Sequence, residues 1–189
     1  MDVDSSSGGI ASLMNSAVSF EKKSINWDCC FFILCAVWFS AWTLLPAFFL
    51  ANTYIDISEN IVWGSHFQFG YDKNPYFGAW ITYFFYYITG GGVWSAYMLS
   101  QLFVMIGVFS VWKLAHEMMS PGRAFVSAVL LLGLAYYGSN ATEFNDDIIE
   151  IGLWPASAYF FYMSLKYQRI KYWLMLGLCA GLAFMTKYF

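Results

Sequence analysis

The chain of 189 residues is 60% hydrophobic, 22% aromatic and only 11% charged. This composition departs from that of soluble domains and indicates a membrane protein. A net charge of −3, with no Gly-rich phosphate loop followed by Lys and Ser or Thr, argues against a nucleic-acid-binding function.

Residues 1–26 are polar, with Ser and Gly at their start, and we predict that they form a cytoplasmic tail. Residues 27–189 are expected to form one transmembrane domain, because a helix that crosses a bilayer takes about 20 apolar residues. The five predicted spans cover residues 27–51, 93–115, 124–137, 148–165 and 172–189. The expected fold is therefore an all-α, polytopic membrane protein.

The connection between the first two spans, residues 52–92, is too polar at its start for a span and too aromatic for a simple loop. Asp56 and Glu59 are three positions apart and would share one face of a helix. We expect an amphipathic helix here that lies along the outer membrane surface. A turn then leads to the aromatic stretch 76–87, whose rings suit the headgroup region.

Basic residues indicate which connections lie in the cytosol. One set of span ends carries Lys22, Lys23, Lys113, Arg123, Lys166, Arg169 and Lys171, and the other set carries Lys73 and Lys187. The positive-inside rule therefore predicts a cytoplasmic N-terminus and external carboxylate-bearing loops.

Three strings suggest a family. They are DISENIVWGSHFQFGYDKNPYFGAWI, FNDDIIEIGLWPASAYFFY and LMLGLCAGLAFMTKYF. In this order they resemble the first external loop, the second external loop with its following span, and a span ending of the GT-C glycosyltransferases. The resemblance is to the family 39-like group, which includes protein O-mannosyltransferases and the lipid A aminoarabinose transferase. Asn74-Pro75-Tyr76-Phe77 replaces the group's Pro-Pro-Leu element. Since family members are longer, the chain is expected to be an N-terminal portion.

The resemblance implies transfer of a sugar from a polyprenyl-phosphate donor to an acceptor hydroxyl on the extracytoplasmic face of an inner or plasma membrane. Asp56 matches the family's external-loop Asp and is expected to accept the acceptor's proton. For Glu59 three roles stay open: orienting Asp56, binding a metal, or simple solvation. Lys73 and Lys187 are expected to contact the donor phosphate, although snorkelling to the interface is an alternative for Lys187.

The second acidic loop has two interpretations. If the helix extended back through the loop, Glu143, Asp146 and Glu150 would lie on one side of it, with Asp147 four positions after Glu143. These four carboxylates would then bind the acceptor or a divalent cation, which is the one cofactor suggested. Alternatively, they form an acidic helix start that the macrodipole favours, although burying Glu150 would cost several kcal/mol without a partner.

The expected partners are the lipid-linked donor, membrane lipids, a glycan, lipid or protein acceptor, and a second chain that supplies missing spans. The competing function is a non-catalytic transporter, flippase or accessory subunit for lipid-linked sugars. Transporters usually place ionisable groups near the middle of the membrane. Because the carboxylates here lie at span ends, the sequence favours chemistry at the membrane surface.

Overall fold

The computed structural model describes residues 25–188, so the predicted tail lies outside it apart from its last two residues. The described residues are helical and contain no strand, which confirms the expected all-α class. The elements in chain order are α2 (Trp27–Phe49), α3 (Ile55–Ser65), α4 (Phe77–Ile88), α5 (Trp94–Met118), α6 (Pro121–Leu132), η1 (Ala135–Tyr137), η2 (Ser139–Thr142), α7 (Asp146–Tyr167) and α8 (Ile170–Phe184).

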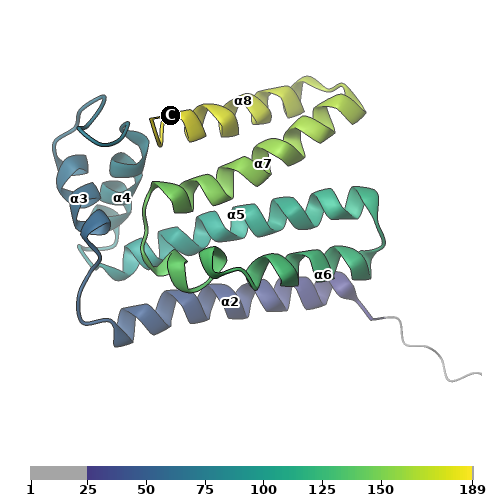
Figure 1. The fold of residues 1–189 in the computed structure, drawn as a ribbon, viewed down its shortest axis with the longest axis horizontal. Helices are drawn as coiled ribbons and strands as arrows, with labels where there is room; N and C mark the ends of the chain where they lie inside the picture. The colour runs from purple at the N-terminus through teal and green to yellow at the C-terminus, as the bar shows by residue number, and fades with distance from the viewer. Residues whose placement is uncertain (1–24, 189) are drawn as a thin grey trace, which may run out of the picture.

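The long helices run side by side, and the short helices α3 and α4 lie together at one end of them (Figure 1). Helix α5 packs against α2, α4, α6 and α7, while α8 packs on α7. The chain connections place the start of α7 and the end of α8 at the α3–α4 end (Figure 1). Segments that are far apart in the sequence therefore meet there.

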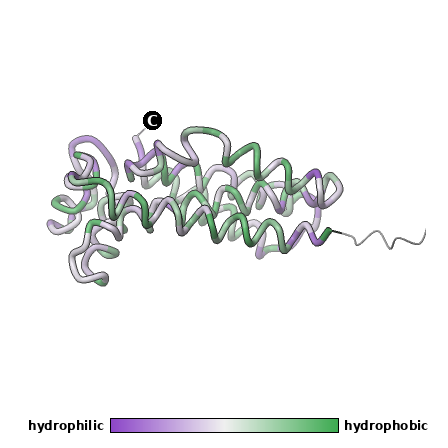
Figure 2. The backbone as a smooth tube through the Cα atoms, turned by 90° about the horizontal axis from the view of Figure 1, so that it is seen from below, coloured by the Kyte–Doolittle hydropathy of each residue, from purple (hydrophilic) through white to green (hydrophobic). Residues whose placement is uncertain are grey.

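Hydrophobic residues follow the long helices, and hydrophilic residues gather mainly where the helices are connected (Figure 2). Large apolar side chains are exposed along α2, among them Phe32, Val37 and Phe48. An exposed apolar surface of this kind is what a helix facing lipid requires.

Two glycines allow α5 and α7 to approach closely. A Cβ atom on Gly152 would lie 2.6 Å from the carbonyl oxygen of Phe103, and one on Gly107 would collide with the carbonyl oxygen of Ile151. Small residues at such contacts let helix backbones pack together in a membrane, where apolar burial alone gives little drive for association. The α5–α7 pair thus forms the centre of the fold.

Three of the described helices are long and apolar enough to cross a membrane, namely α2, α5 and α7. A fourth span exists if α6 and the following 3₁₀ turns count as one segment, which bends by 85°. The bend arises because α6 ends at Leu132 and the backbone is extended at Leu134. Helix α8 has only 15 residues. The expected number of five spans is therefore not confirmed.

The connection after α2 forms two helices, in agreement with the sequence pattern. Helix α3 packs on α4 at Gly64, where a Cβ atom would collide with the carbonyl oxygen of Ala79. Gly64 therefore sets the close spacing of the two helices. The adjoining face of α3, which carries Asp56, Glu59, Asn60 and Trp63, lies toward the start of α7.

Candidate active site at the α3–α4 end

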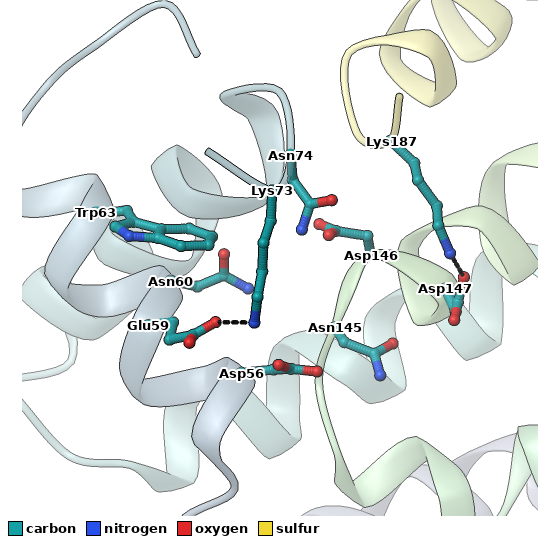
Figure 3. Close-up of a pocket in the computed structure, with 10 residues that line it drawn as sticks. All are labelled: Asp56, Glu59, Asn60, Trp63, Lys73, Asn74, Asn145, Asp146, Asp147 and Lys187. Carbon is teal, nitrogen blue, oxygen red and sulfur yellow. Dashed lines mark hydrogen bonds and ion pairs between the residues drawn. The ribbon is translucent and has the colours of Figure 1, made fainter. Parts of the chain in front are cut away.

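A polar pocket of about 210 Å³ lies between α3, the turn after it, the start of α7 and the turn after α8 (Figure 3). We call it the central pocket. Its lining residues are Asp56, Glu59, Asn60, Trp63, Lys73, Asn74, Asn145, Asp146, Asp147 and Lys187. Six of the eight residues singled out from the sequence line it, and Glu143 and Glu150 do not.

Helix α3 contributes one face to the central pocket. Asp56, Glu59, Asn60 and Trp63 recur at helical spacing and all line it. The spacing argument for Asp56 and Glu59 is therefore correct. Asn60, which the sequence argument missed, is buried between them and Trp63, and its position four residues after Asp56 was the available signal.

Lys73 reaches into the central pocket from the turn between α3 and α4. Its Nζ atom donates a hydrogen bond of 2.8 Å to Oε2 of Glu59. This bond raises the pKa of Lys73 above its ordinary value, and the negative charges of Glu59, Asp56 and Asp146 add to the shift, while partial desolvation opposes it. Glu59 therefore pairs with Lys73 in this structure.

Lys187 enters from the opposite side, on the turn that follows α8. Its Nζ atom donates a hydrogen bond of 2.5 Å to Oδ1 of Asp147. The turn is tied to α4, because the amide of Phe77 donates to the carbonyl oxygen of Met185 at 3.1 Å. The bond to Asp147 is the main reason that the pKa of Lys187 is raised, and the charges of Asp147, Asp146 and Glu150 strengthen the effect against desolvation.

The start of α7 differs from the extended helix considered in the sequence. Asn145 has an extended backbone, and its side-chain oxygen accepts a hydrogen bond of 3.2 Å from the amide of Ile148. This N-cap begins the helix at Asp146. The helix therefore does not extend back to Glu143, and the interpretation that placed Glu143, Asp146 and Glu150 on one helix face does not hold.

Glu143 lines a neighbouring polar hollow of about 270 Å³, which we call the side pocket. Its other lining residues are Tyr54, Tyr136, Ser139, Asn140, Asn145, Asp147 and Ile148. Asn145 and Asp147 line both the side pocket and the central pocket. The two hollows are thus adjacent.

Asp146 and Glu150 are the buried carboxylates of this region, each only 7% exposed. Oδ1 of Asp146 and both carboxyl oxygens of Glu150 have no hydrogen-bond partner within the described part of the chain. Asp146 lines the central pocket, whereas Glu150 lies one helical turn further along α7. An unpartnered buried carboxylate is costly, so each requires a reason.

The carboxylates do not assemble into a ligand set for a metal. No group of three or more His, Cys, Asp or Glu side chains among residues 25–188 is arranged to hold a metal ion. The expected divalent cation therefore remains a prediction without an identified site.

Comparison with known protein families relates the chain to one of them. Residues 73–189 match a family model described as dolichyl-phosphate-mannose-protein mannosyltransferase. The matched region contains Lys73, Asp146, Asp147 and Lys187, and it begins after α3. No curated protein and no solved structure matches the chain significantly.

Proposed function

This chain belongs to the dolichyl-phosphate-mannose-protein mannosyltransferase family, whose model matches well over half of it, and we propose that it transfers a sugar from a polyprenyl-phosphate donor to an acceptor hydroxyl. The observation that carries this proposal is the central pocket, which combines a carboxylate on α3 with two lysines from separate turns. By the positive-inside argument, the pocket opens on the extracytoplasmic side and the N-terminus is cytoplasmic.

Asp56 is the proposed general base. The acceptor oxygen attacks the anomeric carbon of the donor, the bond from that carbon to the phosphate oxygen breaks, and the acceptor's proton passes to Asp56. The products are the glycosylated acceptor, with inverted configuration, and the polyprenyl phosphate. A positioned base typically contributes about 10²- to 10⁴-fold to such a step. In support, Asp56 lines the central pocket and forms none of its salt bridges.

Lys73 and Lys187 are the proposed phosphate ligands. Negative charge grows on the departing phosphate, so ammonium groups directed at it lower the barrier. Glu59 and Asp147 each hold one of these lysines through an ion pair. On this proposal the phosphate joins or displaces these pairs, and the two carboxylates keep the lysines oriented in the absence of donor.

The side pocket is the proposed acceptor subsite. It adjoins the central pocket through Asn145 and Asp147 and contains Glu143 as a further carboxylate. Its tyrosine, serine and asparagine side chains suit a polar acceptor with hydroxyl groups. Glu143 and Asp147 would thus help to orient the acceptor hydroxyl toward the base.

The decisive experiment uses the purified full chain in lipid nanodiscs with dolichyl phosphate mannose. We expect release of dolichyl phosphate, and we expect Asp56→Asn to reduce the rate by at least about 10²-fold. Asp72→Asn is the matched control, because Asp72 is an exposed carboxylate in the same loop region outside the central pocket. Equal rates for the native protein and Asp56→Asn would refute the base assignment.

A further inference from the structure

Asp146 occupies an unusual position in the central pocket. Its side chain lines the pocket although the residue is 93% buried, with 7% exposure, and its Oδ1 atom has no hydrogen-bond partner within the described residues. In Figure 3 the carboxyl group points toward Asn74 and away from the ammonium group of Lys187. Asp146 thus lines the pocket with a carboxyl group whose Oδ1 atom is buried and receives no hydrogen bond.

Two helix starts favour the negative charge at this point. Asp146 is the first residue of α7, and its Oδ1 atom lies against the first turn of α4, where a Cβ atom on Gly78 would come within 2.5 Å of it. Amide groups in the first turn of a helix carry partial positive charge. Gly78 therefore makes the room that the carboxyl group of Asp146 needs beside the first turn of α4.

The cations of the pocket do not satisfy Asp146. Lys73 bonds Glu59 and Lys187 bonds Asp147, so both ammonium groups of the central pocket already have other carboxylate partners. The described residues also provide no three-residue metal site. The Asp146 carboxyl group therefore still lacks a hydrogen-bond donor, and a sugar carries several hydroxyl donors on one small ring.

We propose that Asp146 accepts a hydrogen bond from a hydroxyl group of the donor sugar and thereby discriminates among donor sugars. This inference rests on the proposed function. In the donor the sugar is bonded directly to the phosphate, so its ring must lie beside the groups that hold the phosphate. Asp146 meets this condition, because it lines the central pocket together with Lys73 and Lys187.

Asp56 and Asp146 come from different walls of the central pocket, from α3 and α7 (Figure 3). A ring between them would offer its anomeric carbon on the side of the base and its hydroxyl groups on the side of Asp146. The acceptor is the other source of hydroxyl groups, and the side pocket, lined by Glu143 rather than Asp146, accommodates it. The donor sugar is therefore the ligand that fits Asp146.

The test measures kcat/KM and donor affinity for dolichyl phosphate mannose and for its four monodeoxy analogues. For the native full chain, we expect at least one analogue to have a kcat/KM about 10- to 100-fold below that of dolichyl phosphate mannose. This is the typical effect of removing a hydrogen bond to a buried charge. Asp146→Asn should weaken binding of dolichyl phosphate mannose. It should also reduce the difference between this donor and the deoxy analogue to about 3-fold or less. Asp72→Asn, which changes an exposed carboxylate outside both pockets, should leave the discrimination intact.

Donor affinity is measured as the rise in Tm that the donor causes. This measurement gives a result whether or not the protein catalyses the reaction. Discrimination that survives Asp146→Asn, or a native protein that binds all five donors equally, overturns the inference. A change confined to acceptor KM would also overturn it, by assigning Asp146 to the acceptor. Tight, discriminating binding without release of dolichyl phosphate would instead refute the proposed transferase function and leave Asp146 as a sugar ligand.

Discussion

The ammonium group of Lys187 lies 2.5 Å from the Oδ1 atom of Asp147, although the two residues are 40 positions apart in the chain. This ion pair joins the turn after α8 to the first turn of α7. It closes one side of the central pocket and brings the last basic residue of the chain beside the acidic helix start. The lysine and the buried Asp146 thus belong to one electrostatic unit.

Replacing either pocket lysine should impair phosphate departure. We expect Lys73→Met and Lys187→Met each to reduce kcat by about 10²- to 10³-fold, since each removes a cation proposed to face the developing charge. Lys171→Met is the control, because Lys171 is an exposed lysine at the start of α8, away from the central pocket. The measurement is single-turnover release of dolichyl phosphate. A normal rate for Lys187→Met would favour snorkelling as the role of that lysine.

The Lys187–Asp147 pair should give stability with a defined pH dependence. Because folding raises the pKa of Lys187 above its ordinary value of 10.5, the pair stabilises the folded protein fully below that value. The stabilisation is lost as the pH rises through the raised pKa. We therefore expect the Tm difference between the native protein and Asp147→Asn to be present at about pH 8 and to shrink near pH 11. A difference that grows with pH would contradict the assignment.

The glycine contact between α5 and α7 should not tolerate a methyl group. Gly152→Ala places a Cβ atom 2.6 Å from the carbonyl oxygen of Phe103, so the helices must separate. We expect a loss of about 1–3 kcal/mol of unfolding free energy, the usual effect of overpacking. Gly177→Ala is the matched control, because its Cβ would meet nothing within 4 Å and should raise helix stability by about 0.5–1 kcal/mol. If both substitutions change the free energy of unfolding in detergent by the same amount, the close-packing argument is refuted.

Removal of divalent cations tests the expected cofactor. If carboxylates of the central pocket hold a cation together with the donor phosphate, EDTA should lower the initial rate by at least about 10-fold, and an unchanged rate would contradict this expectation. Activity that disappears with EDTA and returns with Mg²⁺ or Mn²⁺ would show that the donor phosphate completes a metal site. The same titration on Asp146→Asn would then identify whether that carboxylate is a ligand.

Local pattern explains what the sequence could predict about the site. The shared helix face of Asp56 and Glu59 depends only on the period of an α-helix. In the structure this face of α3 lines the central pocket. The same logic failed for Glu143, because the side chain of Asn145 caps α7 and begins the helix three residues later. The Asn145 cap involves only residues that are close in the sequence, but the pattern of apolar residues does not reveal it.

Hydrophobicity and its period act along the chain, so the membrane class and the helical stretches could be predicted from the order of the residues. Tertiary packing decided that Lys73 pairs with Glu59, that Lys187 pairs with Asp147, and that the chain bends between α6 and the following 3₁₀ turns. It also decided that Asp146 is buried against α4 without a partner. These relationships depend on how closely separate helices approach, and that distance follows from side-chain volume at contacts between residues far apart in the chain.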